Sequence, residues 1–179
     1  MFLAASLNPE YFSQRINLFV ALAPVATTAN ISNKYIVEAA GKIKLIELAL
    51  VHELHYYNWF TPMPMADGAL DVACDMLPNL CKDVGRMIFN GAGVDNPARF
   101  DVFMSNEPSG SSYRTFVYYA QMINSGKFNR YDYGPIKNRQ VYGQAEVPLV
   151  PIEKYNIPTV LLSGDIDGLA TPADVAWLS

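Results

Sequence analysis

The sequence predicts an α/β fold in which a small parallel sheet is interrupted by a helical insertion. Residues 18–22 and 157–163 are short, unbroken apolar runs, which is the composition of strands buried on both faces of a parallel sheet. Residues 31–105 lie between them, show helical periodicity and contain no convincing strand. We therefore expect two core segments separated by helices.

Composition narrows the class of protein. The chain has 179 residues, of which 51% are hydrophobic and 17% are charged, against about 25% charged in an average globular protein. A chain this apolar can bury enough surface to become ordered, so a disordered protein is excluded. The net charge is −4 and lysine and arginine form no cluster, which argues against nucleic-acid binding. Two cysteines are too few for a disulfide scaffold.

No membrane-spanning or targeting segment is predicted. The longest charge-free stretch is 16–33, but its apolar part ends at Ala26 and contains Pro24, so it is too short to cross a bilayer. The first residues are apolar but lack the basic segment with which a signal peptide begins.

The first helix that starts within the chain is predicted at Asn8-Pro9-Glu10. Asparagine is a preferred N-cap, proline suits the first helical position, and an acidic residue interacts favourably with the positive end of the helix dipole. We expect this helix to run to about Arg15. The strand at 18–22 follows it and is bounded by Pro24.

Two helices are predicted within the insertion. Apolar residues recur at three- and four-residue steps between 36 and 54, and a second helical stretch at 70–89 holds both cysteines. Residues 56–65, between the two helices, are uncharged and rich in aromatic side chains and methionine. The recurring apolar residues of the first helix are Ile43, Ile46, Leu50 and Leu54.

The segment after the insertion is predicted to contain a helix, a loop, a strand and a last helix. Residues 106–112 form a turn with several candidate caps, and the helix after it ends before Gly126. A loop rich in tyrosine, glycine and proline is expected at 128–151, before the strand at 157–163. Thr171-Pro-Ala-Asp174 has the pattern of a capping box, so the last helix begins there. The helix before Gly126 has three apolar residues on one face: Phe116, Tyr119 and Ile123.

Two acidic residues lie on the glycine-bracketed loop after the second strand. Functional groups of open α/β sheets gather at the carboxyl ends of parallel strands, and both Asp165 and Asp167 qualify. In a nucleophile–histidine–acid arrangement, such a carboxylate accepts the imidazole N–H, fixes its tautomer and stabilises the imidazolium. The alternative is that both are solvated turn residues, since aspartate and glycine are common in turns.

Other candidate sites carry weaker signals. His52 and His55 are three residues apart on a predicted helix, but no third metal ligand is evident, so a surface or core position is favoured over a metal site. Gly91 and Gly93 do not follow a strand, so no dinucleotide site is inferred. Asn30-Ile-Ser32 is a glycosylation sequon, which has meaning only in a secreted protein. No cofactor or metal is predicted.

Cys74 and Cys81 could pair if the helix around them is broken. Seven residues of one helix span about 10.5 Å, which is too far for a disulfide. Pro78 lies between the cysteines and argues for a break. A bridge and two free thiols therefore both stay open.

Several motifs together resemble the acid lipase family, which includes gastric and lysosomal acid lipases. They follow in order along the chain: Leu22-Ala-Pro-Val-Ala26, Ser125-Gly-Lys-Phe128, Tyr131-Asp-Tyr-Gly134, Asn138, Tyr142-Gly-Gln144, and Gly164-x-x-Asp167-x-Leu-Ala-x-Pro172-x-Asp174-Val. The combination is more specific than any single motif. The similarity is strong at both ends of the chain and weak between about 31 and 100, and related lipases carry a cap disulfide near the cysteines, with different spacing.

The resemblance implies a partial α/β-hydrolase fold with a helical cap, or lid. Asp167 would be the acid of the catalytic triad, Asp165 a loop neighbour, and Asp174 the acid at the start of the last helix. Residues 56–65 would be either a lipid-facing surface or buried cap core. The expected parts are hydrolase core, cap and returning core: 1–30, 31–125 and 126–179.

The serine and histidine of a triad are not found among these residues. Hydrolases of this fold place the nucleophile in Gly-x-Ser-x-Gly, which the chain lacks, and the histidine follows the acid, whereas His52 and His55 precede Asp167. By resemblance, Met1–Leu7 looks like the continuation of the helix after the nucleophile. We therefore expect an internal part of a larger enzyme, inactive and poorly soluble alone.

The predicted function is that of part of a serine lipase acting on neutral lipid esters. Its partners would be the lipid ester and the lipid–water interface, and by resemblance the compartment is secreted or lysosomal. A hydrolase with another ester or amide substrate is a more general interpretation. The alternative from a different class is a catalytically inert truncated product or a non-catalytic lipid-binding cap module.

Overall fold

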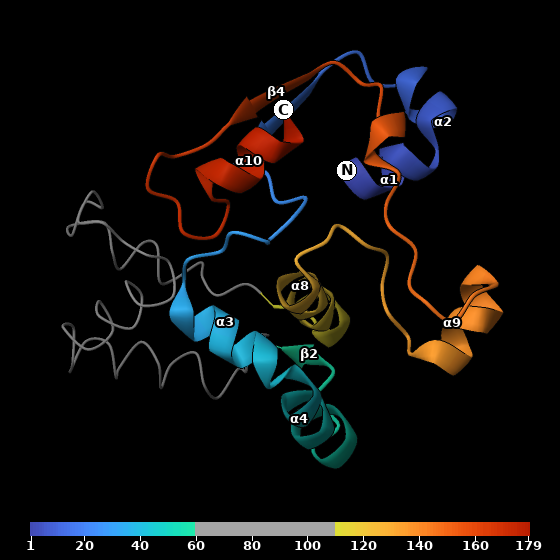
Figure 1. The fold of residues 1–179 in the computed structure, drawn as a ribbon, viewed down its shortest axis with the longest axis vertical. Coiled ribbons are helices and arrows are strands. Elements are labelled where there is room, and N and C mark those ends of the chain that lie inside the picture. The colour runs from blue at the N-terminus through green and yellow to red at the C-terminus, as the bar shows by residue number, and fades with distance from the viewer. Residues whose placement is uncertain (60–109) are drawn as a thin grey trace. The chain divides into compact units, whose positions relative to one another are not determined.

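The computed structural model describes residues 1–59 and 110–179, which fall into two compact units (Figure 1). Unit 1 comprises residues 1–32 and 118–179, and unit 2 comprises residues 33–117. The elements of unit 1 are α1 (Phe2–Leu7), α2 (Pro9–Ser13), β1 (Phe19–Leu22), the end of α8 (Tyr113–Ser125), α9 (Pro135–Tyr142), η3 (Ile152–Lys154), β4 (Thr159–Leu162) and α10 (Pro172–Leu178).

The two predicted strands pair with each other in parallel, as expected. Phe19 lies opposite Thr159 and Leu22 lies opposite Leu162, so the two strands end at the same edge of the sheet. Helices and a parallel pair of strands confirm the α/β class, and the arrangement is compatible with part of an α/β-hydrolase.

One face of this sheet is covered, and the other is open to solvent. The covered face packs into a core with α1 and α10, to which Phe2, Ala21 and Leu178 contribute. The opposite face presents four aliphatic side chains that are 42–73% exposed: Val20, Leu22, Val160 and Leu162. The runs therefore have the composition of strands buried on both faces, but only one face is covered, which agrees with the expected part of a larger sheet that is poorly soluble alone.

The first two helices follow the predicted boundaries in part. Residues 2–7 are helical, as the resemblance implies, and Pro9 occupies the first turn of α2. Asn8 stands at the N-cap position, but its side chain makes no capping hydrogen bond. The helix ends at Ser13 rather than near Arg15.

The helix predicted at 36–54 is three shorter elements in unit 2. The Asn33 side chain caps the first one by accepting hydrogen bonds from the backbone N–H groups of Tyr35 and Ile36, at 3.1 and 3.2 Å. The chain then breaks at Lys42 and ends in a π-helix, which changes the periodicity and leaves Leu54 69% exposed. The elements are α3 (Lys34–Gly41), α4 (Ile43–Glu47) and η1 (Leu48–Glu53).

Unit 2 also contains a strand pair that the sequence did not indicate. β2 (Asn58–Trp59) pairs with β3 (Ser111–Ser112) in an antiparallel arrangement. The expectation of no strand between 31 and 105 was therefore wrong. A two-residue strand is too short to show the alternation on which strand prediction depends.

The helix before Gly126 is α8, and it ends as predicted. Gly126 has φ +63°, and its N–H donates to the carbonyl of Met122 at 2.8 Å. A residue in this left-handed conformation is the usual C-terminal stop of a helix. Of the three residues expected on the apolar face, Tyr119 is exposed and the other two are half-buried. The buried side chains of this helix include Val117 and Ala120 instead.

The loop predicted at 128–151 contains a helix. α9 has proline at its first position and ends at Tyr142, before Gly143, which has φ +77°. Asn129 precedes this helix and Leu149 follows it, and the two residues pair in an isolated antiparallel bridge. The prediction of a continuous loop was wrong because α9 has almost no apolar face, and only its terminal glycine and proline residues mark it as a helix.

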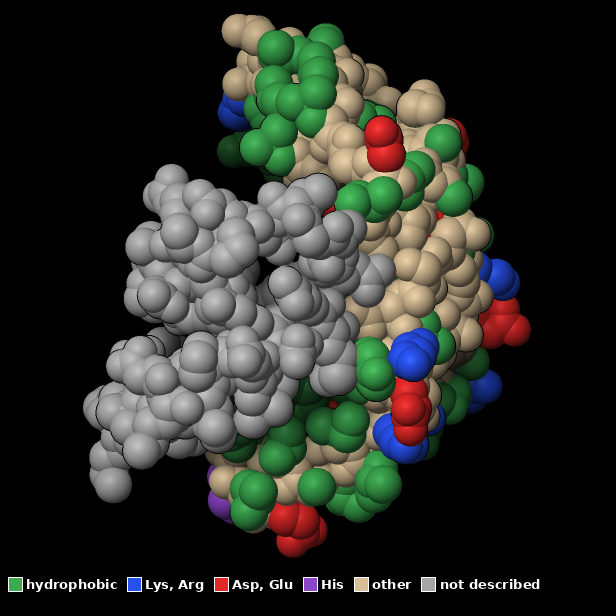
Figure 2. Space-filling model, turned by 90° about the vertical axis from the view of Figure 1, so that its left-hand side faces the viewer, with side chains coloured by type: hydrophobic (Ala, Val, Ile, Leu, Met, Phe, Trp, Pro, Cys, Tyr) green, Lys and Arg blue, Asp and Glu red, His purple; other side chains and the backbone are tan. Residues whose placement is uncertain are grey.

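The surface combines exposed apolar side chains with few charges. On the face shown in Figure 2, hydrophobic side chains reach the surface in several places and charged side chains are scattered. Across 1–59 and 110–179, no helix combines the length and apolar character needed to cross a membrane.

Candidate functional site

The loops that follow β1 and β4 leave the sheet at the same edge. The N–H of Ala23 donates to the carbonyl of Leu162 at 2.7 Å, which continues the strand pairing to the start of both loops. Because the strands are parallel, the loop at 23–33 and the loop at 163–171 emerge side by side. This is the edge of an α/β sheet where functional groups gather.

Asp167 is held by its own loop. Its Oδ1 accepts hydrogen bonds from the N–H groups of Leu169 at 2.8 Å and Ala170 at 3.0 Å, and its own N–H donates to the Gly164 carbonyl at 3.3 Å. The residue is half-buried, and within the part of the chain described, Oδ2 accepts no hydrogen bond. The carboxylate is thus fixed through one oxygen while the other can accept a further donor, as an acid that orients a histidine must.

Asp165 differs from Asp167 in both exposure and bonding. It is exposed, and its carboxylate makes no hydrogen bond or ion pair with residues of the two described ranges. Their position in the loop makes both acids candidates, and the family resemblance selects Asp167. The structure distinguishes them, since only Asp167 has a fixed orientation.

Asp174 is a buried carboxylate that joins the two loops. It is 3% exposed and accepts hydrogen bonds from Asn30, through Nδ2 at 2.9 Å and through the backbone N–H at 3.1 Å. The predicted N-cap is present, since the Thr171 hydroxyl accepts from the N–H of Asp174 at 3.2 Å, and this hydroxyl, rather than the backbone N–H of a complete capping box, donates to Asp174 Oδ2 at 3.1 Å. Sequence reasoning missed Asn30, because no local pattern connects residues 144 positions apart.

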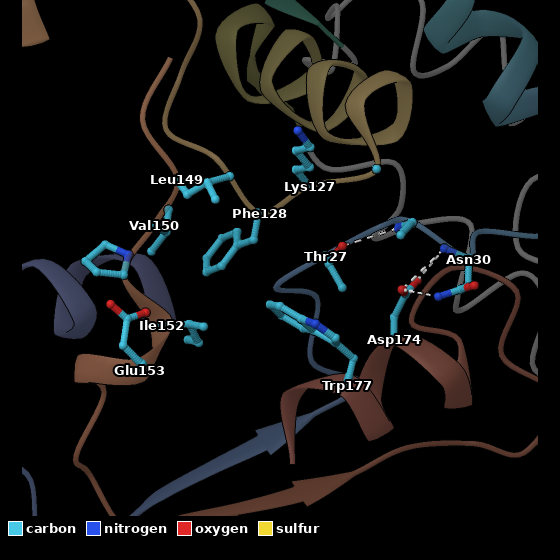
Figure 3. A pocket seen from close by; sticks show the side chains of 13 residues that line it. Thr27, Asn30, Lys127, Phe128, Leu149, Val150, Ile152, Glu153, Asp174 and Trp177 are labelled. Atoms are coloured by element: carbon cyan, nitrogen blue, oxygen red, sulfur yellow. Dashed lines mark hydrogen bonds between the residues drawn. The ribbon is translucent and has the colours of Figure 1, made fainter. Parts of the chain in front are cut away.

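A cavity of about 570 Å³ lies beside this pair of residues in unit 1. Figure 3 shows Phe128, Val150 and Ile152 on one side of it, and Trp177, with Asp174 next to it, on the other. Its size is within the range of about 300–1,000 Å³ that is usual for small-molecule pockets, and its walls are mainly apolar. Asp167 is not among the residues that line it.

The two histidines are not arranged as a metal site. His52 lies in η1, whereas His55 follows that helix with φ +54°, so they do not share a helix face. The ring of His55 instead stacks on Tyr57, with centroids 6.3 Å apart. Among the described residues, no group of three or more potential metal ligands occurs.

The aromatic segment that begins at Tyr56 is packed where the structure describes it. Trp59 is 6% exposed, its ring stacks on Phe116 with centroids 5.5 Å apart, and its indole N–H donates to the Tyr56 carbonyl at 3.0 Å. Tyr57 is 52% exposed. The alternative of buried core therefore applies to Trp59.

Several predicted features lie outside the described residues, so the structure does not test them. They are the rest of the aromatic segment at 60–65, the helix at 70–89, the pair Cys74 and Cys81, the glycines at 91 and 93, and the turn at 106–109.

Comparison with known proteins finds similarity to lipases. No family model matches the chain. Human gastric triacylglycerol lipase is 34% identical over 99% of this chain, human lipase member K is 31% identical over 97%, and lipase lipl-1 of Caenorhabditis elegans is 29% identical over 98%. The chain spans only 43–44% of the length of these relatives. The resemblance is confirmed, since these lipases are similar to the chain over nearly all of its own length.

Proposed function

We propose that these residues are part of a serine lipase in which Asp167 is the acid of a Ser-His-Asp triad. The observation that supports the proposal most directly is the bonding of the Asp167 carboxylate. It is fixed by two backbone N–H groups at the carboxyl end of β4, in a chain aligned over 99% of its length with a triacylglycerol lipase.

In the proposed reaction, each triad group has one task. The serine oxygen attacks the ester carbonyl while the histidine takes its proton, and the histidine then gives that proton to the leaving alcohol. Asp167 accepts the other imidazole N–H through its available Oδ2, which fixes the tautomer and stabilises the imidazolium. The 179 residues contain no Gly-x-Ser-x-Gly, and both histidines precede Asp167, so the serine and base of the proposal are still to be assigned.

Residues 31–125 are proposed to form the cap over the bound lipid. This is supported by the compact unit at 33–117, whose described part consists of short helices and one two-residue strand pair. The substrate class we propose is a neutral lipid ester, in line with the triacylglycerol named for the gastric relatives. We propose a secreted or lysosomal location on the same grounds.

The proposal is tested by reading the coding sequence on both sides of these residues. A Gly-x-Ser-x-Gly immediately before Met1 and a histidine after Ser179 are expected, and the absence of either would overturn it. The protein from the longest reading frame is then assayed on a tributyrin emulsion and on p-nitrophenyl butyrate, with the 179-residue chain as the control. Hydrolysis is expected only from a protein that contains all three triad groups.

A non-catalytic product is the second candidate, and the missing nucleophile motif favours it. The same assay separates the two. If the 179-residue chain is the whole product, it should release no p-nitrophenol above background while still binding lipid vesicles. Release above background would exclude the non-catalytic candidate.

A further inference from the structure

We propose that Asn30 and Asp174 form a positioning clamp for the loop that carries Asp167. The clamp is defined as the hydrogen bonds from the Asn30 side chain and backbone to the Asp174 carboxylate. The proposal rests on the role proposed for Asp167, which is the group the clamp would position. Neither Asn30 nor Asp174 is expected to contact the reacting atoms.

The Asp174 carboxylate has partners on both oxygens. Oδ1 accepts from Asn30 Nδ2 at 2.9 Å, and Oδ2 accepts from the Asn30 N–H and from the Thr171 hydroxyl, both at 3.1 Å. The dashed lines of Figure 3 show the bonds between Asn30 and Asp174. Burying a carboxylate is costly unless charge-assisted hydrogen bonds compensate. These bonds therefore define one strongly preferred position for Asp174.

A second bond attaches the same two loops closer to Asp167. The N–H of Ser32 donates to the carbonyl of Gly168, the residue after Asp167, at 3.2 Å. Thr171 caps α10 and bonds to Asp174. It directly follows Ala170, whose N–H donates to Asp167 Oδ1. The loop is thus attached to the 30–32 segment on both sides of the residues that orient Asp167.

Asp174 also lines the cavity, so it could instead bind substrate. The experiment must distinguish substrate binding from positioning of Asp167. A residue that binds substrate changes KM when it is replaced. A residue that positions the triad acid changes kcat and the pH profile, because a displaced carboxylate stabilises the imidazolium less. An opposite charge nearby raises the pKa of a histidine, so a loosened Asp167 lowers that pKa and moves the acidic limb of the rate profile to lower pH.

Three variants of the protein from the longest reading frame test the clamp. Asp174→Asn removes the charge while keeping the shape, and Asn30→Ala removes only an exposed side chain, which keeps the test valid if Asp174→Asn does not fold. In Asn30→Asp combined with Asp174→Asn, the amide and the carboxylate exchange places, so one charge-assisted pair is re-formed. Asp165→Asn is the matched control, since it also removes one negative charge, from an exposed position in the loop that carries Asp167.

Hydrogen exchange is the readout that does not depend on activity. In Asp174→Asn and Asn30→Ala, the Leu169 and Ala170 amides should exchange at least about 10-fold faster, whereas the amides of the paired strands stay protected. The exchanged pair should restore most of the protection, and Asp165→Asn should change none of it. Unchanged exchange at Leu169 and Ala170 in both clamp variants would overturn the proposal.

Kinetics then connect the clamp to the triad. Clamp variants should lower kcat by about 10- to 100-fold with KM within about twofold, and they should move the acidic limb to lower pH. Added to Asp167→Asn, Asp174→Asn should cause no further loss, because it acts through Asp167. A rise in KM with kcat unchanged would overturn the positioning role. If Asp167→Asn itself keeps full activity, the proposed function fails, whatever the exchange shows.

Discussion

Asn138 donates a hydrogen bond from Nδ2 to Oδ1 of Asp132 at 2.7 Å, and its side chain is among the most deeply buried of the described residues, at 1% exposure. The same amide donates to the Ala145 carbonyl at 2.9 Å, while Asn138 Oδ1 accepts from the N–H of Tyr133 at 3.0 Å. Asp132 Oδ1 also accepts from the N–H of Gly134 at 2.8 Å. This part of the lipase-like motif therefore builds the turn that starts α9.

Replacing Asn138 should be strongly destabilising. Asn138→Ala removes a buried amide together with its hydrogen bonds to Asp132, Tyr133 and Ala145, so the free energy of unfolding should fall by about 2–4 kcal/mol. Urea denaturation followed by circular dichroism measures the change. Gln140→Ala, an exposed amide on the same helix, should stay within about 0.5 kcal/mol of the parent. Equal effects of the two variants would contradict the structural role of Asn138.

Two glycine-to-alanine substitutions should change the free energy of unfolding in opposite directions. Gly126 has φ +63°, so Gly126→Ala should cost about 1–2 kcal/mol although a Cβ there meets no neighbour within 4 Å. Gly41 has equal space and lies at the end of α3, so Gly41→Ala should stabilise by about 0.5–1 kcal/mol. The denaturation midpoints of the two variants should therefore move apart, and movement in one direction would be inconsistent with the backbone geometry described.

Tyr118 should make stability fall at high pH. Burial, with smaller contributions from Tyr119 and Tyr142, raises the pKa of Tyr118 to about 12, and its hydroxyl donates to the Asn129 carbonyl at 2.6 Å. Above its ordinary pKa of 10, the unfolded tyrosine loses its proton while the folded one keeps it. The stabilisation is therefore complete below pH 10 and lost as pH rises towards 12.

Urea midpoints between pH 8 and pH 12 measure this dependence. Tyr118→Phe should lower the midpoint at pH 8, because a hydrogen bond is lost, and should flatten the decline between pH 10 and 12. Tyr35→Phe, which changes an exposed tyrosine, is the control and should run parallel to the parent. A decline of equal slope in Tyr118→Phe would show that another group causes the pH dependence.

The exposed face of the parallel sheet and the core of unit 1 should respond differently to polar substitution. Val160 is 42% exposed, so Val160→Thr should leave the denaturation midpoint unchanged while it lowers binding of the dye ANS and raises solubility. Val150 is 4% exposed and belongs to the core, so Val150→Thr should cost about 1–3 kcal/mol because it buries a hydroxyl. ANS binding that is unaffected by Val160→Thr would argue against an accessible apolar face.

Local chemistry explains which features could be predicted from the sequence. The apolar runs at 18–22 and 157–163, the Thr171 cap and the stop at Gly126 depend on residues within one turn or one strand, and all four are present. The break at Lys42 follows Gly41, a poor helix former, and was missed because apolar residues recur at helical spacing on both sides of it.

The missed features depend on contacts between distant residues or on very short elements. Pairing of Asn58–Trp59 with Ser111–Ser112 and the bonds from Asn30 to Asp174 exist only once the chain is folded. For the candidate site, the sequence indicated the loop and both acids, whereas only the fold shows which of them has a fixed carboxylate.

The most direct measurement compares Asp167→Asn with Asp165→Asn in the protein from the longest reading frame. Both variants remove one negative charge from the same loop, and only Asp167 is held by backbone N–H groups. If Asp167 orients the catalytic histidine, Asp167→Asn should lower kcat on p-nitrophenyl butyrate by about 10³- to 10⁴-fold with the fold unchanged. Asp165→Asn should keep a rate within about twofold of the parent. Full activity in Asp167→Asn, or an equal loss in both variants, would contradict the assignment of Asp167 as the triad acid.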